Sequence, residues 1–328
     1  MLMDDHLLSR EQAELIAKDL FGSEETLLSF ERLKGGYTNA AYRLTSSSND
    51  NGILIKSAHK KQSALLSYET NMFAHEINTS QMLLMNNVRT PKVLKYSPYG
   101  EIMEKEYAVY EYIKSDYPPN DADISLIDYK SLDTVITRFH SIKGDGFGYL
   151  SRSLYVTWYS FIVALGTELL RLAEDHMFLE DKGYTVELKA EISESRDIFE
   201  EITASYYIHN DIGKKNFLFK RSGDFYSFLA LIDLERSMYG DLDFEYSRAE
   251  LTDPECYKHI MLDGRQNVSA NRSKRLRIYM LINLLISMHF MKVKCNAPLL
   301  MEQLTKIFIK RFKEKVPYDF GPCYPSPN

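Results

Sequence analysis

Short apolar-containing segments separated by turn-forming residues occur in the first third of the chain, and this pattern predicts a small β-sheet. Residues 26–34, 40–45 and 53–56 read as strands, with a glycine-containing turn after the first and a Ser/Asn/Asp/Gly turn after the second. Residues 93–96 and 107–112 have the same character, with turn-forming residues between them. We therefore expect a group of short strands that pair with one another.

Apolar positions three and four residues apart predict helices around and after these strands. Ser9 and Gln12 have the spacing of a capping box, which opens a helix that ends near Gly22, and residues 63–86 carry a second helical pattern. Beyond a proline-containing break at residues 115–120 the chain becomes mostly helical, with helices expected at 123–142, 154–181, 185–204, 273–292 and 298–315.

One pair of strands interrupts the helical half. Residues 217–220 and 228–233 read as strands joined by a turn at residues 221–224. The expected fold class is therefore α+β, with a sheet-rich lobe at residues 1–113 and a larger helical lobe at residues 114–328.

Composition narrows the class of function. The formal net charge of −6 argues against a general nucleic-acid binder, because neutralising phosphates needs clustered Lys and Arg. Three scattered cysteines indicate neither a disulfide framework nor a zinc site. The longest apolar run, residues 279–291, is too short to span a bilayer, and the N-terminal residues do not resemble a signal peptide. We expect a cytoplasmic protein with no membrane partner.

Candidate chemistry is concentrated between residues 207 and 241. Asp211 and Asn216 lie five residues apart between a predicted helix and a predicted strand, and Asp233 ends the apolar strand that follows. A carboxylate on such a loop can orient a hydroxyl or accept its proton, and amide and carboxylate oxygens are ligands suited to Mg²⁺. Each residue alone would be read as part of a turn or a strand end. The joint pattern favours a phosphotransfer site.

The stretch from His209 to Asn216 resembles the H-G-D-x4-N loop of the aminoglycoside phosphotransferase family, small-molecule relatives of the protein kinases. Residues 232–237 and 239–241 are similar to that family's I-D-x-x-x-S and G-D segments. The resemblance implies a bilobal protein-kinase-like fold, with one main helix in the small lobe. It also implies Asp211 as catalytic base, His209 as a brace of the loop, and Asn216 and Asp233 as magnesium ligands.

One residue departs from this pattern. Asn210 stands where the aminoglycoside enzymes usually have glycine, whereas choline and ethanolamine kinases of the same superfamily commonly have H-N-D. The acceptor class therefore stays open.

The resemblance implies a binding site for ATP or GTP in the first lobe. A glycine-containing loop between two strands would approach the phosphates. A strand lysine paired with a helix glutamate would contact them, and Glu76 is preferred to Glu69 as that glutamate. The strand leading into the second lobe would hold the adenine or guanine base. The residues implied are Gly35, Gly36, Tyr37, Thr38, Asn39, Lys56, Glu76, Glu111, Tyr112 and Ile113.

Acidic residues follow the metal-binding segment closely. Asp241, Asp243 and Glu245 would favour a cationic acceptor if they lined its pocket, whereas the plainer interpretation is a solvated loop and helix face. The basic cluster at residues 272–277 is expected to be the solvated start of a helix.

The sequence thus predicts a Mg²⁺-dependent O-phosphotransferase with a small-molecule acceptor and no nucleic-acid partner. An aminoglycoside-type antibiotic is the leading acceptor, and a choline-like or other metabolite is the alternative. A catalytically inactive binding protein with the same fold is the competing class. A protein kinase is disfavoured because D-F-G and A-P-E segments are absent from the sequence.

Overall fold

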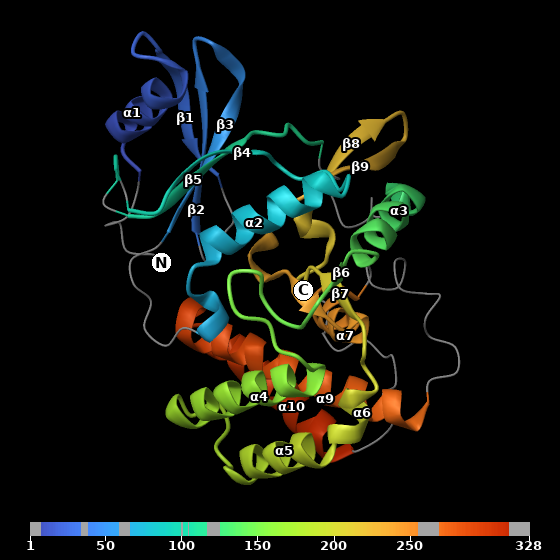
Figure 1. The fold of residues 1–328 in the computed structure, drawn as a ribbon. Helices are drawn as coiled ribbons and strands as arrows, with labels where there is room; N and C mark the ends of the chain where they lie inside the picture. Colours follow the sequence, from blue (N-terminus) through green and yellow to red (C-terminus); the bar gives the residue numbers. More distant parts are fainter. Residues whose placement is uncertain are drawn as a thin grey trace.

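The computed structural model describes residues 8–33, 39–58, 66–99, 101–103, 105–116, 125–254 and 269–314. Within these ranges the chain forms a sheet-rich lobe and a helical lobe, shown one above the other in Figure 1.

The first lobe is built on a five-stranded antiparallel sheet. Its spatial order is β1-β2-β3-β5-β4. The strands are β1 (Leu27–Arg32), β2 (Asn39–Ser46), β3 (Asn49–Ala58), β4 (Val93–Ser97) and β5 (Tyr107–Glu111).

Each face of this sheet is covered by one helix. Ile53 and Ile55 of β3 pack in a cluster with α1 (Arg10–Phe21), whereas Leu54 between them packs with α2 (Met72–Met85). Successive side chains of a strand point to opposite faces, so this alternation lets one strand contact both helices. The Ser9–Gln12 capping box predicted at the start of α1 is present.

The second lobe is mostly helical. A large apolar cluster joins α4, α5, α6, α7, α9 and α10. Its helices, with α3 beside the strands, are α3 (Tyr129–His140), α4 (Trp158–Asp175), α5 (Gly183–Glu194), α6 (Arg196–Glu200), α7 (Leu242–Thr252), α9 (Ala270–His289) and α10 (Pro298–Glu314).

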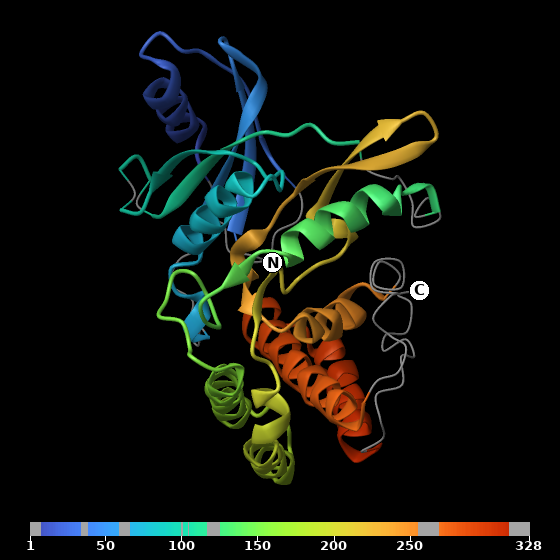
Figure 2. The ribbon, with the colours of Figure 1, turned by 45° about the vertical axis from the view of Figure 1, so that its right-hand side comes forward.

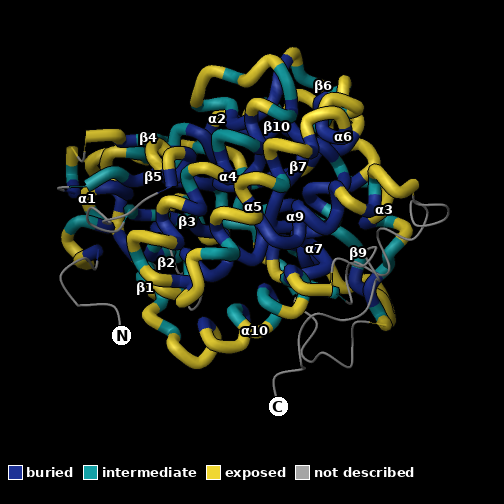
Figure 3. The backbone as a smooth tube through the Cα atoms, turned by 90° about the horizontal axis from the view of Figure 1, so that it is seen from below, coloured by how far each residue is buried: buried dark blue, intermediate teal, exposed yellow. Residues whose placement is uncertain are grey.

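Helix α9 is the central element of this lobe. It continues into a π-helix, η6 (Phe290–Cys295), and the segment Ala270–Val293 is long and apolar enough to cross a membrane. However, 78% of its apolar window is buried inside the fold, and Figure 3 shows α9 as a dark blue core surrounded by other elements. The apolarity of α9 is therefore accounted for by packing against neighbouring helices.

Short strands lie on both sides of the candidate loop in the sequence, with β7 before it and β8 after it. A three-stranded sheet has the order β10-β7-β6, and β8 pairs with β9 in a hairpin that lies beside α3 (Figure 2). The strands are β6 (Lys143–Gly144), β7 (Ser205–Ile208), β8 (Phe217–Ser222), β9 (Phe225–Leu231) and β10 (Met238–Gly240). Three single-turn 3₁₀ helices are η1 (Ser67–Glu69), η3 (Lys214–Asn216) and η4 (Leu234–Arg236).

The structure corrects two of the predicted helices. The helix expected at 63–86 begins only at Met72, because Asn71 has a left-handed backbone conformation (φ 64°) that ends the preceding turn. The helix expected at 185–204 is two helices that meet at Ser195, where the backbone leaves helical geometry.

Two further corrections concern the loop and the acidic stretch. The segment before the loop of Asp211 is the strand β7, not a helix. The residues expected to be a solvated loop and helix face form α7, which is buried along most of its length.

Candidate active site

The loop that carries Asp211 leaves β7 at the centre of the molecule. Tyr207 and Ile208 pair with Tyr239 and Met238 of β10, which fixes where the loop begins. Gly240 suits this pairing, since an added Cβ would lie 2.8 Å from the Ile208 side chain.

Asn210 has a left-handed backbone conformation, with φ of 57°. Glycine and asparagine are the residues that adopt this conformation most readily. The departure from glycine at this position therefore follows from backbone geometry and does not discriminate between acceptor classes.

A buried carboxylate from α7 holds the loop in place. Glu245, which is 0% exposed, accepts the backbone N–H groups of His209 at 2.7 Å and Asn210 at 2.9 Å through Oε1. Its other oxygen, Oε2, accepts a hydrogen bond from Nε2 of His140 in α3. His209 in turn donates from Nε2 to the carbonyl of Ile232 at 2.9 Å. These contacts join α3, α7 and the end of β9 to one loop.

The two oxygens of Asp211 have different surroundings. Oδ2 accepts from Nζ of Lys215 at 2.8 Å and from Nδ2 of Asn216 at 3.2 Å. Oδ1 has no hydrogen-bond partner, and Nη2 of Arg248 lies 3.6 Å from it. Oδ1 is thus unpaired and sealed from solvent by the side chains around it.

Nearby basic side chains keep the carboxyl group of Asp211 ionised. Burial raises the pKa of its carboxyl, but Arg248, Arg236 and Lys215 outweigh this effect and hold the pKa well below its usual range. The group is therefore ionised across the physiological range.

Asn216 and Asp233 lie next to each other. The backbone N–H of Ile232 donates to the carbonyl of Asn216 at 2.9 Å, so the strand end that carries Asp233 is fixed beside η3. Asn216 also donates from Nδ2 to the carbonyl of Asp211 at 2.7 Å, which leaves Oδ1 as its ligand atom. Asp233 has a left-handed backbone (φ 63°) and a side chain that is 42% exposed. An amide oxygen and a carboxylate are hard donors that fit Mg²⁺.

Lys56 and Glu76 form the pair preferred on sequence grounds. Nζ of Lys56 lies 2.6 Å from Oε1 of Glu76 and 3.8 Å from Oδ1 of Asp233, while Tyr110 donates to Oε2 of Glu76 at 3.2 Å. Burial lowers the pKa of Lys56, but Glu76, Asp233 and Glu235 hold it above its usual value, so the amine is charged. Glu69 is not the partner of Lys56, and its Oε2 accepts the N–H of Leu66.

Of the predicted nucleotide loop, Gly35, Gly36, Tyr37 and Thr38 lie outside the described residues. Asn39, the first residue of β2, donates from Nδ2 to Oε2 of Glu235 at 3.2 Å. Burial raises the pKa of Glu235, and the nearby charge of Asp233 adds to that effect. The side chain of Asn39 thus contacts the second lobe next to the candidate metal ligands.

The predicted hinge leaves the sheet at the end of β5. Glu111 is the last strand residue, and its carboxylate accepts the N–H of Lys92 and lies 3.3 Å from Arg89. Tyr112 lies beneath the guanidinium of Arg43, 4.4 Å from its ring centroid. In the described ranges, no hydrogen bond engages the backbone N–H of Tyr112 or Ile113. These groups could therefore bind a purine base.

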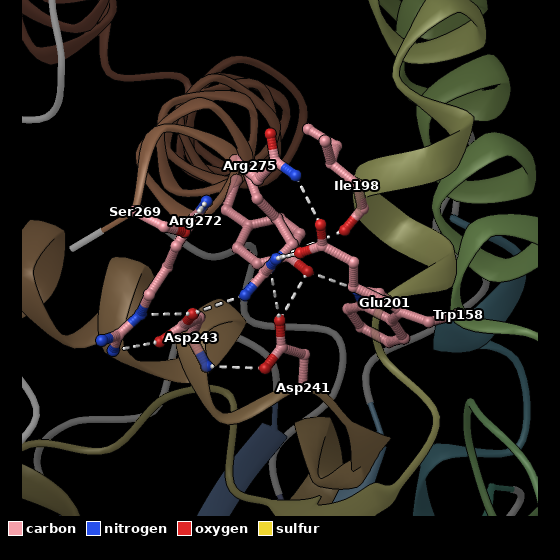
Figure 4. Close-up of polar contacts among 10 residues, drawn as sticks. Trp158, Ile198, Glu201, Asp241, Asp243, Ser269, Arg272 and Arg275 are labelled. Carbon is pink, nitrogen blue, oxygen red and sulfur yellow. Dashed lines mark hydrogen bonds and ion pairs between the residues drawn. The ribbon is translucent and has the colours of Figure 1, made fainter.

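Asp241 and Asp243 bind protein cations rather than an open space. Figure 4 shows Arg275 between them, with Nε 3.1 Å from Asp241 and Nη2 3.1 Å from Asp243. Arg272 contacts Asp243 at 2.7 Å, and Tyr279 donates to Asp241 at 2.7 Å. An acceptor-binding role for Asp241, Asp243 and Glu245 stays a prediction that these contacts do not support.

The sequence predicted that the basic cluster at residues 272–277 would be a solvated helix start, and the structure shows that this prediction was wrong. Arg275 and Arg277 are buried, Arg272 is half-buried, and only Lys274 of the four is exposed. Opposite charges 29 to 34 residues apart in the sequence gave no local signal that they would pair.

Two arginines near Asp211 were not predicted. Arg248 of α7 bonds to the carbonyl of Asn283 and the hydroxyl of Ser287 on α9, and Arg236 ends η4. The spacing of Arg236 from Asp233 was visible in the sequence, but its burial was not.

Comparison with solved structures agrees with this architecture. An aminoglycoside phosphotransferase, APH(4)-Ia, in ternary complex with AMP-PNP and hygromycin B, is 16% identical with a TM-score of 0.65, covering 93% of this chain and 97% of that one. A protein assigned as a fructosamine-3-kinase from Thermobifida fusca is 13% identical with a TM-score of 0.63, covering 92% and 97%.

A third structure, the GDP and kanamycin complex of APH(2")-IIia, is 14% identical with a TM-score of 0.59, covering 92% and 97%. No protein-family model and no curated protein sequence matches the chain. At these identities the likeness establishes the kinase-like fold predicted from the sequence.

Proposed function

We propose that this protein is a Mg²⁺-dependent O-phosphotransferase that moves the γ-phosphate of ATP or GTP to a hydroxyl of a small molecule. The observation that carries the proposal is the convergence of Lys56, Asp211, Asn216 and Asp233, contributed by β3, the loop after β7, η3 and the end of β9. Phosphoryl transfer needs a phosphate contact, metal ligands and a group that orients the nucleophile, and these residues supply all three.

The roles follow from the geometry. Lys56, held by Glu76, would contact the donor phosphates, and the backbone after β5 would hold the purine. Asn216 and Asp233 would hold Mg²⁺, which when bound neutralises charge on the phosphate oxygens.

Asp211 would orient the acceptor through its carboxylate. The acceptor oxygen then bonds to the γ-phosphorus, and the bond to the bridging oxygen breaks with its electron pair leaving on the nucleoside diphosphate. The hydroxyl proton passes to Asp211. Because its carboxylate is a weak base, we assign it mainly an orienting role until the proton is released late in the transfer.

Two acceptor classes follow from the fold and the sequence. The similar structures include complexes with hygromycin B and kanamycin and also fructosamine-3-kinases. We keep an aminoglycoside-type antibiotic as the leading acceptor and a choline-like, ethanolamine-like or other metabolite as the alternative. Neither Asn210 nor the pair Asp241 and Asp243 favours one class, given their contacts.

The competing proposal, an inactive binding protein with a kinase fold, is tested by ligand-induced stabilisation. Mg-ATP or Mg-GTP should raise the melting temperature, because a ligand that binds only the folded state stabilises it in proportion to ln(1 + [L]/Kd). Nucleotide consumption is then measured across aminoglycosides, choline, ethanolamine, fructosamines and sugars. Stabilisation without consumption by any acceptor would favour the inactive protein, and no stabilisation by either nucleotide would contradict the proposed function.

A further inference from the structure

Arg236 differs from the other buried arginines of the described structure. Four arginines are buried there, and three of them bind protein groups: Arg248 binds α9, Arg275 binds Asp241 and Asp243, and Arg277 binds Glu191. Arg236 is only 8% exposed. It makes no hydrogen bond and no ion pair within 4.0 Å to any described residue, and its guanidinium carbon lies 5.3 Å from the ring centroid of Phe290.

The guanidinium nevertheless remains accessible to solvent. None of its nitrogens is fully sealed from solvent. Since they also donate to no protein group, their N–H groups face an accessible space. A buried arginine has five donors in a fixed fork, and leaving them unused is costly unless a ligand accepts from them.

The position of Arg236 places this space at the reaction centre. It lies three residues after Asp233, and its charge acts on the carboxylate of Asp211. Burial lowers the pKa of Arg236, but Tyr68, Asp211, Glu235 and Glu69 together hold that pKa above its usual value. The side chain is thus a permanent cation near the candidate base and three residues after a candidate metal ligand.

We propose that Arg236 binds an anionic oxygen group at the point of transfer. The planar guanidinium matches the geometry of phosphate and carboxylate oxygens and binds them through two parallel hydrogen bonds. That group is either the γ-phosphoryl of the nucleotide or a carboxylate or phosphate on the acceptor. This inference rests on the proposed phosphotransfer and adds a binding residue to it.

The test measures anion binding to the full chain, separately from turnover. The variants are Arg236→Met, which removes the cation, and Arg236→Lys, which keeps charge without the fork. Arg277→Met is the matched control, since it removes a buried arginine whose partner Glu191 lies on α5. Kd values are measured for Mg-AMP-PNP, Mg-GMP-PNP and the matching diphosphates, and stabilisation by sodium sulfate is measured with and without AMP-PNP.

The two sources of the anion give different results. If Arg236 binds the γ-phosphoryl, Arg236→Met weakens the triphosphate analogue about tenfold or more and leaves the diphosphate unchanged. If it binds an acceptor anion, both nucleotides bind as in wild type, and sulfate stabilises the AMP-PNP complex of wild type but not of Arg236→Met. Arg236→Lys should lie between, and Arg277→Met should match wild type in ligand affinity.

Other results separate this inference from the proposed function. If no nucleotide binds but sulfate stabilises wild type and not Arg236→Met, the phosphotransfer proposal fails and the anion site stands. If Arg236→Met equals wild type with every ligand, or if wild type binds neither nucleotide nor sulfate, the inference is overturned.

Discussion

Oε1 of Glu245 accepts the backbone N–H of His209 at 2.7 Å, so one buried carboxylate joins α7 to the loop that carries Asp211. The same oxygen accepts the N–H of Asn210, and the other oxygen binds His140. A residue that the sequence suggested for acceptor binding thus has the contacts of a positioning residue.

Removing this carboxylate should destabilise the fold. Glu245→Ala leaves two buried N–H groups and His140 without their acceptor, so we expect a loss of about 2–5 kcal/mol in the free energy of unfolding. Glu245→Gln keeps an acceptor oxygen and should lose less. Urea denaturation measures both, with exposed Glu187→Ala as control. Equal stability of Glu245→Ala and wild type would show that the contacts contribute nothing.

Lys56 should matter for nucleotide affinity. Lys56→Met removes the cation that lies between Glu76 and Asp233, and we expect Mg-nucleotide binding to weaken about tenfold or more. Isothermal titration calorimetry measures the Kd. Lys306→Met, which breaks an exposed ion pair with Glu302, is the control. A Kd within twofold of wild type for Lys56→Met would rule out the phosphate contact.

The contacts of Arg275 with Asp241 and Asp243 should stabilise the fold. Arg275→Met leaves the buried carboxylate of Asp241 without its cation and leaves Asp243 with Arg272 alone, and we expect about 3–5 kcal/mol of destabilisation. Lys274→Ala, one residue away and exposed, is the matched control and should change stability little.

The KM for the acceptor tests whether the same cluster binds substrate. Asp243→Asn should leave the KM for a polycationic acceptor such as kanamycin unchanged, because Arg272 and Arg275 already bind this carboxylate. A tenfold rise in that KM, with nucleotide affinity unchanged, would restore the acceptor-binding role.

His75 should make stability depend on pH. Burial lowers its pKa from 6.5 to about 4, while Nε2 donates to the carbonyl of Ser237. The unfolded chain therefore takes up a proton first as the pH falls. The contribution of neutral His75 is complete above about pH 6.5 and is lost as the pH falls toward 4, a loss of roughly 3 kcal/mol.

The variant His75→Gln keeps an N–H donor for Ser237 and removes the titration. Its free energy of unfolding should fall less between pH 7 and pH 5 than that of wild type, as measured by urea denaturation. His176→Gln, in the other lobe, is the control. Identical pH dependence in His75→Gln and wild type would show that His75 is not the titrating group.

The sequence was sufficient for the fold class and for the grouping of Lys56, Glu76, Asp211, Asn216 and Asp233. Strand and helix periods are local signals, and the spacing of the loop residues is local as well. The strand β7 was missed because four residues are too few for a period to be read. The burial of Arg275 and Glu245 was missed because their partners lie on distant segments, and only the fold shows which charges are paired.

The substitution Asp211→Asn tests the central claim most directly. Transfer of labelled γ-phosphate from ATP or GTP to the acceptor identified by the screen is measured for wild type and variant, together with nucleotide Kd. Asparagine keeps the size of the side chain but cannot accept the proton, so we predict unchanged nucleotide affinity and a rate at least about a hundredfold lower. Turnover by Asp211→Asn at the wild-type rate would contradict the account.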